Sequence, residues 1–309
     1  MLLLLQATTA LLLPERFARR DVIGGAGAAA IASLPSAAGH AAGAASGLIT
    51  ILGASGKTGA LCVDACLRRG QPVRALTRSG QYPPGVGSSP LLTIGQCDVR
   101  DESALNAGLT GSTAVIYAAS ASKLGGNAEA IDNLGAAAAA KAALATKVKR
   151  FVLISSTAVT RPESLGFKFT NAFVPGYARG VMDQKLLGEK AVRTLYDADQ
   201  SSCTYAIVRP GGLEESSDVV GAAGLEVSQG DALAGVVSRP DLAAFTVELA
   251  RSEALTFDTA LEIYTTQSAQ PCEGRFKPLL ADGRVRRLHG ASWRELLAGI
   301  QAEGAYFVP

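Results

Sequence analysis

Short apolar runs alternate with longer segments of helical periodicity along most of the chain after residue 47. The first run, Leu48–Leu52, is apolar or β-branched throughout, which is typical of a strand buried on both faces of a parallel sheet. The alternation predicts an α/β fold with a doubly wound parallel sheet, whose ligands bind at the carboxyl ends of the strands. The expected strands cover residues 48–52, 72–78, 91–94, 114–120, 149–157, 203–209 and 261–266, and the expected helices include residues 60–67, 101–109, 127–147, 242–251 and 293–300.

Three glycines follow the first apolar run in the spacing G-x-x-G-x-x-G. They are Gly53, Gly56 and Gly59, and helical periodicity begins at residue 60. A glycine turn between a strand and a helix lets backbone N–H groups approach a phosphate closely, so this stretch predicts a dinucleotide-binding turn. One alternative is an ordinary glycine-rich turn. Another is a nucleoside-triphosphate P-loop, but that motif requires a glycine five residues before Gly56, where the chain has Ile51.

The end of the second expected strand indicates which dinucleotide is bound. In NAD-specific folds an acidic residue at this place binds the ribose 2′-hydroxyl, and this strand ends without one. Arg78 stands close to that position, with Arg74 earlier on the strand and Ser79 after it. A guanidinium binds a 2′-phosphate through charge-assisted hydrogen bonds, so the sequence favours NADP over NAD. The alternative for Arg78 is a solvated surface arginine.

Two further strand ends carry residues suited to a dinucleotide. Asp98 follows the third expected strand, where a carboxylate can meet the adenine amino group, and Asp101 is expected to cap the next helix. The fourth strand ends in small residues, Ala118 and Ala119, which would let a cofactor ribose approach closely.

Residues 1–46 differ in kind from the rest, and we exclude them from the fold. Met1–Leu13 is an apolar run too short to span a membrane, and Arg19 and Arg20 precede a second, weakly apolar stretch that ends near residues 42–44. Two tandem signals resemble the bipartite presequence of plastid proteins. We therefore expect a leader that is removed or disordered, a plastid location in either the stroma or the thylakoid lumen, and no transmembrane span in the mature chain. The alternative is a tail that carries no address.

Composition excludes several classes of function. The 309 residues suit one large α/β domain, and a net charge of +2 with 18% charged residues gives no reason to expect nucleic-acid binding. The chain has only two histidines, too few for a histidine-based metal site or a Ser-His-Asp triad, so we expect no metal. The five scattered cysteines do not form a disulfide framework.

Taken together and in order, these motifs resemble the short-chain dehydrogenase/reductase superfamily, in particular its atypical, NmrA-like NAD(P)-binding branch. The matching pieces are Gly53–Gly59, Arg74–Arg78, Cys97–Asp101, Asp132 with Gly135, Lys149–Ser156, Lys185 and Arg209–Gly211. The resemblance implies a Rossmann domain over residues 47–309, with small C-terminal cap elements from about residue 211 that cover the substrate.

The resemblance also implies roles for individual residues. Gly53, Gly56 and Gly59 would shape the pyrophosphate turn, Ser55 and Lys57 would lie along it, Thr58 would start the helix, Arg78 would face the 2′-phosphate, and Asp98 and Val99 would face adenine. Lys185, on a helix opened by Pro175-Gly176, would bind the nicotinamide ribose, and Ser155 and Ser156 lie where the family has a substrate-orienting hydroxyl. A plain strand end is the alternative for the two serines.

The chain departs from the family at the catalytic acid. Typical members carry Tyr-x-x-x-Lys, in which the lysine lowers the pKa of a phenol one helical turn away. Four residues before Lys185 the chain has Val181, which cannot transfer a proton. Tyr177 lies eight residues before Lys185 and could replace the phenol only if the helix starts late and a loop bends it back.

Three functions are therefore open. The first is an NADP-dependent oxidoreductase acting on an unidentified small molecule, and the second is a non-catalytic NADP-binding redox sensor or plastid assembly factor. The third, a sugar-nucleotide epimerase, also needs the missing tyrosine. A basic cluster around residues 275–288 is either a solvated loop or a site for a protein partner.

Overall fold

The computed structural model describes residues 47–82, 89–121, 127–173, 179–216 and 219–305. Contacts divide the chain into residues 1–42 and residues 43–309, and every described residue belongs to the second unit. The predicted leader, residues 1–46, lies outside the described residues. Among the described helices, none is long and apolar enough to cross a membrane.

A nine-stranded sheet forms the centre of the described part, in the order β13-β8-β11-β6-β5-β4-β1-β2-β3. The strands from β3 to β11 run parallel, and β8 and β13 continue the sheet in antiparallel pairs. The order 3-2-1-4-5-6 is that of a Rossmann fold and confirms the predicted doubly wound sheet. The strands are β1 (Ile49–Leu52), β2 (Val73–Thr77), β3 (Leu92–Gln96), β4 (Ala114–Tyr117), β5 (Arg150–Ile154), β6 (Thr204–Pro210), β8 (Leu225–Ser228), β11 (Thr259–Thr265) and β13 (Arg287–Leu288).

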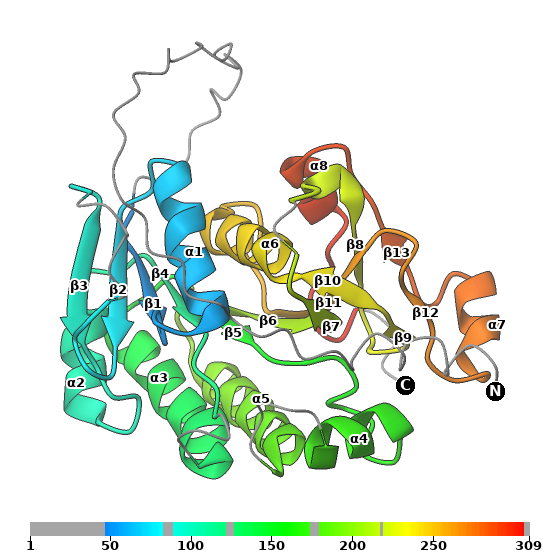
Figure 1. Ribbon diagram of the computed structural model, residues 1–309, viewed down its shortest axis with the longest axis horizontal. Helices are drawn as coiled ribbons and strands as arrows, with labels where there is room; N and C mark the ends of the chain where they lie inside the picture. Colours follow the sequence, from blue (N-terminus) through cyan, green and yellow to red (C-terminus); the bar gives the residue numbers. More distant parts are fainter. Residues whose placement is uncertain (1–46, 83–88, 122–126, 174–178, 217–218, 306–309) are drawn as a thin grey trace, which may run out of the picture. The chain divides into compact units, whose positions relative to one another are not determined.

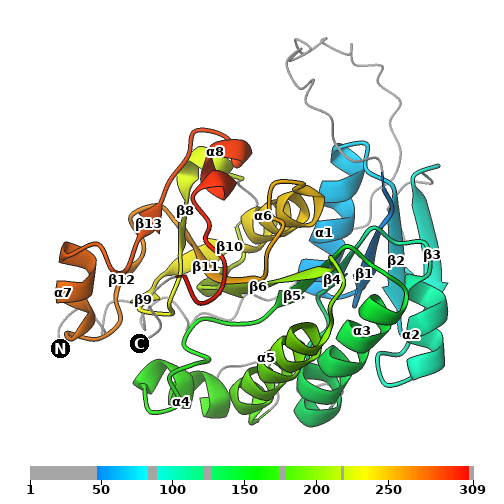
Figure 2. The same cartoon turned by 180° about the vertical axis from the view of Figure 1, so that it is seen from behind.

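Helices cover both faces of this sheet. On one face α1 (Lys57–Arg68) and α6 (Arg239–Arg251) lie side by side, and on the other lie α2 (Glu102–Leu109), α3 (Leu134–Ala145) and α5 (Val181–Ala198) (Figures 1 and 2). Helix α4 (Leu165–Phe173) contacts α5. Asp101 caps α2 as expected, because its carboxylate accepts from the N–H groups of Ser103 and Ala104.

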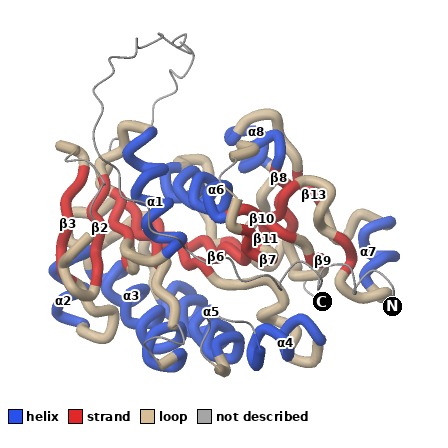
Figure 3. Tube along the Cα trace, in the orientation of Figure 1, coloured by secondary structure: helices blue, strands red, loops and turns tan. Residues whose placement is uncertain are grey.

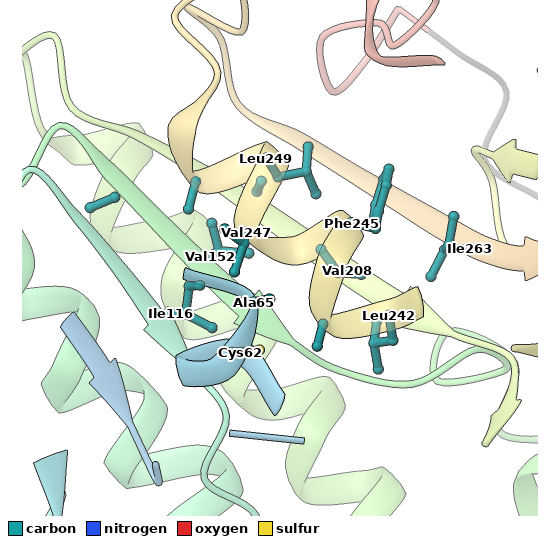
Figure 4. Close-up of a cluster of buried hydrophobic side chains, with 14 of the residues drawn as sticks. Cys62, Ala65, Ile116, Val152, Val208, Leu242, Phe245, Val247, Leu249 and Ile263 are labelled. Carbon is teal, nitrogen blue, oxygen red and sulfur yellow. The ribbon is translucent and has the colours of Figure 1, made fainter. Parts of the chain in front are cut away.

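The apolar core on the α1–α6 face shows why strands and helices alternate in the sequence. Figure 4 shows Cys62 and Ala65 of α1 directed toward Ile116 and Val152 of the sheet, with Phe245 of α6 in the same cluster. All these side chains are buried. Burial of Cys62 raises the pKa of its thiol well above the ordinary value, so this cysteine serves as a small apolar side chain.

Smaller elements lie beside the main sheet after residue 211 (Figure 3). Strand β7 (Gly212–Glu214) pairs with β10 (Val236–Ser238), and β9 (Leu233–Ala234) pairs with β12 (Gln270–Pro271). The remaining short elements are η1 (Glu129–Asn133), η2 (Ala222–Gly224), α7 (Phe276–Ala281) and α8 (Trp293–Ala298).

Three helix starts differ from the sequence-based expectation. The helix expected over 127–147 begins with a π-helical turn, η1, which contains Asp132, and the Asp132 carboxylate accepts from the Ala121 N–H after β4. Helix α5 begins at Val181, after Gly180 in a left-handed conformation with φ of 75°, whereas the predicted start at Pro175-Gly176 lies outside the described residues. Helix α6 begins at Arg239, three residues early, because Ser238 accepts from the N–H of Asp241.

Candidate functional site

The glycine turn joins β1 to α1 at the point where the order of the sheet reverses, between β1 and β4. Gly53 has a φ of +79°, and a Cβ there would lie 2.7 Å from the backbone of Ala119. A Cβ on Gly59 would lie 2.2 Å from the Gly53 carbonyl oxygen. The first glycine therefore permits a sharp turn against β4, and the last lets α1 pack closely on the turn.

The N-terminus of α1 has hydrogen-bond donors to spare. Gly56 N–H donates to the Gly53 carbonyl, whereas the N–H groups of Ser55, Lys57 and Thr58 donate to no acceptor in the described part of the chain. Helix α1 starts at Lys57, one residue before the predicted Thr58. A cradle that a Cβ would fill, next to unpaired N–H groups at a helix N-terminus, fits the pyrophosphate of a dinucleotide.

At the expected adenosine end, Arg78 is exposed directly after β2. Its carbonyl accepts from Gln96 Nε2 at 3.2 Å, and its guanidinium makes no hydrogen bond or salt bridge with any described residue. Arg74 has a different role, because its guanidinium donates to the carbonyls of Gly108 and Thr110 at the end of α2, 2.6 and 3.0 Å away. Arg78 is therefore the arginine of this strand that remains available to a 2′-phosphate.

Asp98 is already paired in this structure. Arg100 Nε donates to Asp98 Oδ1 at 2.9 Å, and Arg100 Nη2 donates to Oδ2 at 2.5 Å. These bonds lower the pKa of the Asp98 carboxyl to about 2. The carboxylate lies half-buried beside the buried Val99, so an adenine amino group would have to share it with Arg100.

Lys185 lies in the first turns of α5 and is nine-tenths buried. Its Nζ pairs with Asp132 Oδ1 at 2.9 Å, and the same carboxylate accepts from Ser120 Oγ at 2.7 Å and from Ala121 N–H at 2.9 Å. A Cβ on Gly188 would lie 2.2 Å from the Asp132 carbonyl, so the glycine lets α5 approach η1 closely enough for the pair to form. The carboxylate thus fixes the lysine ammonium at the carboxyl ends of β4 and β5.

A small hollow opens beside this ion pair. Its lining comes from the ends of β4 and β5 with the ion pair, and consists of Tyr117, Ala119, Asp132, Leu153, Ile154, Ser155 and Lys185. Ser155 Oγ is buried and lies beside the Glu189 carboxylate, whose pKa it helps to lower by hydrogen bonding, although the contact falls short of ordinary hydrogen-bond geometry. Ser156 Oγ instead donates to the neighbouring Thr157 carbonyl at 3.2 Å. Of the two serines, only Ser155 is among the residues that line the hollow.

Val181 stands where the family has its phenol, and the structure buries it. The side chain is 1% exposed and packs with Ala121, Val159, Phe167 and Met182. Residue 181 therefore contributes to apolar packing, and its side chain has no group that could transfer a proton. The late start of α5 meets one condition for a substitute phenol from Tyr177, but Tyr177 itself lies outside the described residues.

A buried charge network lies behind the hollow. Arg209 of β6 donates to both carboxylate oxygens of Glu189 at 3.0 and 2.7 Å and to Glu262 at 3.2 Å. Burial raises the pKa of Glu189, but the Arg209 guanidinium outweighs burial and holds this pKa below its ordinary value. The network joins α5, β6 and β11 below the Lys185 site.

The basic cluster at 275–288 is largely neutralised by its own neighbours. Arg275 pairs with Glu273 at 2.7 Å, Arg284 with Asp282 at 2.8 Å, and Arg287 with the buried Glu226 at 3.5 Å. The cluster spans α7 and β13 rather than a loop alone. Partner binding here stays a prediction.

Sequence reasoning missed two groups that the structure brings to the site. Asp132 was noted only as part of a motif, and its i,i+3 spacing to Gly135 gave no sign of a contact with Lys185 far along the chain. Glu215 and Arg239, discussed below, come from segments without a recognisable motif. No cluster of three or more potential metal ligands occurs among the described residues.

Comparisons with known proteins agree with this geometry. A profile of an NAD(P)H-binding family matches residues 53–253. The chain is 28% identical over 251 residues to "Protein TIC 62, chloroplastic" of Arabidopsis thaliana, a match that covers 73% of this chain and 37% of that protein. The chain thus spans little more than a third of this relative's length.

Solved structures share the fold at low identity. The oxidoreductase ylbE of Lactococcus lactis superposes with a TM-score of 0.56 at 20% identity, covering 76% of this chain and 97% of that one. A short-chain dehydrogenase/reductase of Veillonella parvula in complex with NADP gives a TM-score of 0.53 at 17% identity, covering 72% of this chain and 96% of the other. With the glycine turn, the sheet order and the matched profile, the chain belongs to the NAD(P)H-binding family and has a Rossmann fold.

Proposed function

We propose that this protein binds NADP(H) in preference to NAD(H) and acts as an oxidoreductase on a small carbonyl or alcohol. The observation that carries the cofactor preference is Arg78, an exposed and unpaired guanidinium at the end of β2. NAD-specific proteins have a carboxylate at this strand end that binds the ribose 2′-hydroxyl, and this strand end has none. A guanidinium instead forms strong charge-assisted hydrogen bonds with an anion such as the 2′-phosphate of NADP.

The residues of the hollow support chemistry at the nicotinamide end. When bound, the nicotinamide would supply or accept a hydride. The Lys185 ammonium, fixed by Asp132 at 2.9 Å, would stabilise negative charge on a substrate oxygen, and the Ser155 hydroxyl, which lines the same hollow, would donate a hydrogen bond to that oxygen. Since Val181 cannot transfer a proton, the proton for that oxygen would come from Lys185 or from water.

The cofactor proposal is tested by binding NADPH and NADH to residues 47–309 and to the Arg78→Ala variant. Loss of the charge-assisted bonds to a 2′-phosphate should weaken NADPH binding roughly tenfold to a hundredfold and leave NADH binding unchanged. The control is Arg68→Ala, which removes an exposed arginine paired with Asp64 at the far end of α1. Equal losses for both dinucleotides in Arg78→Ala would contradict the proposed preference.

A second candidate function is a non-catalytic NADP-binding redox sensor or assembly factor in the plastid. Val181 favours it, because a buried apolar side chain stands at the position where the family carries its catalytic phenol. Oxidation of NADPH against a panel of carbonyl compounds separates the two functions. Turnover that Lys185→Met abolishes supports the oxidoreductase, whereas tight NADPH binding without turnover on any compound supports the sensor.

We also propose a plastid location. The tandem signals in residues 1–46 support it, and so does the similarity to a protein named as chloroplastic. A fluorescent fusion to the full chain should enter plastids, and a fusion that lacks residues 1–46 should not. Equal distribution of both fusions would overturn this proposal.

A further inference from the structure

Helices α1 and α6 bring their N-termini together on one face of the sheet (Figures 1 and 2). The contact is polar: Arg239 Nη1, at the start of α6, donates to Thr58 Oγ1 in the first turn of α1 at 3.4 Å. The Arg239 side chain is 15% exposed, so packing holds its guanidinium beside the glycine turn. Arg239 lies 181 residues from Thr58 in sequence, which explains why no motif revealed it.

One carboxylate oxygen receives two cations at this place. Glu215, just after β7, accepts at Oε1 from Lys57 Nζ at 2.7 Å and from Arg239 Nε at 3.0 Å. Lys57 and Arg239 contribute two positive charges, and Glu215 contributes one negative charge. The cluster lies at the N-terminus of α1, where the N–H groups of Ser55, Lys57 and Thr58 have no acceptor among the described residues. The arrangement therefore leaves positive charge that a second anionic oxygen would stabilise.

The ion pairs of Glu215 are of a kind that exchanges readily. Its side chain is 61% exposed and that of Lys57 is 71% exposed, and exposed pairs contribute about 0–1 kcal/mol. Glu215 and Arg239 also line a surface hollow together with Leu61, Asp64 and Arg68 of α1, so solvent and solutes reach the carboxylate. An anion with two charges and several oxygens would compete with a single carboxylate for both cations.

We propose that Arg239 is a further pyrophosphate-binding residue, and that Glu215 is an internal competitor that occupies Lys57 and Arg239 until a dinucleotide displaces it. The inference rests on dinucleotide binding at the glycine turn, as in the proposed function. The affinity for the dinucleotide then depends on an exchange of anions, because the Glu215 carboxylate is released into solvent when the pyrophosphate binds. Its release also frees the end of β7 from α1 and α6.

The test compares Glu215→Gln with Glu214→Gln, which removes the same charge one residue away, at an exposed position. Dissociation constants for NADPH and NADH are measured by nicotinamide fluorescence with the wild-type chain and each variant. Glu215→Gln should tighten binding of both dinucleotides about threefold to tenfold, because the competitor is gone, and Glu214→Gln should change neither by more than about twofold. Equal effects of the two variants would mean that only the overall charge matters, which would overturn the proposal.

Arg239→Gln should weaken NADPH and NADH by the same factor, about tenfold, because both carry the pyrophosphate. Arg239→Lys retains the charge without the guanidinium fork and is the control for misfolding. Its dissociation constants for both dinucleotides should lie between those of wild type and Arg239→Gln. In the double variant Glu215→Gln/Arg239→Gln the gain from Glu215→Gln should shrink, since one of its cations is absent. Full additivity would show that Glu215 does not compete for Arg239.

The outcomes separate this inference from the proposed function. If wild-type protein binds no dinucleotide, both fail. If Arg78→Ala discriminates NADPH from NADH but Arg239→Gln changes neither affinity, the proposed preference stands, and Glu215 and Arg239 only hold β7 against the helices. Inorganic pyrophosphate is a direct probe: it should raise the melting temperature of wild type, and raise it less in Arg239→Gln.

Discussion

At the scale of single residues, the Asp132 carboxylate determines the position of Lys185. The pair is buried on both sides, and Asp132 also accepts two further hydrogen bonds from the end of β4. Breaking a buried pair by removing one partner leaves an uncompensated charge and costs about 3–5 kcal/mol. We expect Asp132→Asn to lower the free energy of unfolding in urea by about 3 kcal/mol.

The double variant Asp132→Asn/Lys185→Met provides the control for this prediction. Because it removes both charges, it should lose less stability than the sum of the two single variants. Strictly additive losses would mean that the two charges do not interact, contrary to the observed 2.9 Å contact.

At the scale of elements, the three glycines of the turn have separable effects. A methyl group on Gly59 would meet the Gly53 carbonyl oxygen at 2.2 Å, so α1 would have to move away from the turn. A methyl group on Gly56 would meet only the same oxygen, at 3.2 Å, and Gly56 is the N-cap of α1, where the pyrophosphate is proposed to bind. Gly59→Ala should therefore lower the melting temperature by several degrees, whereas Gly56→Ala should mainly weaken dinucleotide binding.

Thermal unfolding with and without NADPH measures both effects. For Gly56→Ala the melting temperature without ligand should stay near that of wild type, and the ligand-induced rise should shrink. A reversed result, with stability lost in Gly56→Ala and retained in Gly59→Ala, would contradict the assignment of roles.

The elements also show how far the sequence could predict the structure. Apolar runs and the G-x-x-G-x-x-G spacing were enough for the order and type of the main strands, because a parallel strand is buried on both faces and α1 must follow the turn. The π-turn at η1 and the late start of α5 were not predicted. The contacts of Asp132 with Ala121 and Lys185 join residues far apart in sequence and leave no local pattern either.

The candidate site divides in the same way. The phosphate turn and Arg78 could be proposed from sequence, since local backbone and strand ends define them. The Glu215–Lys57–Arg239 cluster could not, because its members come from three separate segments. The occupation of Asp98 by Arg100 depends on side-chain conformation, which spacing alone does not determine.

At the scale of the whole described unit, buried charges connect the Lys185 side of the sheet to the C-terminal strands. Arg209 lies between Glu189 and Glu262, and Arg193 bridges Glu189 to Glu303 at 3.1 and 2.7 Å. Three carboxyl groups thus share two guanidinium groups. One carboxyl is left undercompensated, and it is Glu262: burial raises its pKa to about 7, and Arg209 reverses this only in part.

This raised pKa predicts how stability changes with pH. The folded protein binds the Glu262 proton more tightly than the unfolded chain does, whose carboxyl has an ordinary pKa of 4.5. The contribution of this group to stability is therefore fully present below pH 4.5 and is lost as the pH rises toward 7.

In Glu262→Gln no proton is lost, and the amide can still accept from Arg209. The melting temperature of wild type should thus fall between pH 5 and pH 8 by several degrees more than that of Glu262→Gln. Scanning calorimetry at both pH values measures the difference. Parallel pH profiles for the two proteins would contradict the prediction, because they would mean that Glu262 is ionised at both pH values and that its ionisation costs no stability.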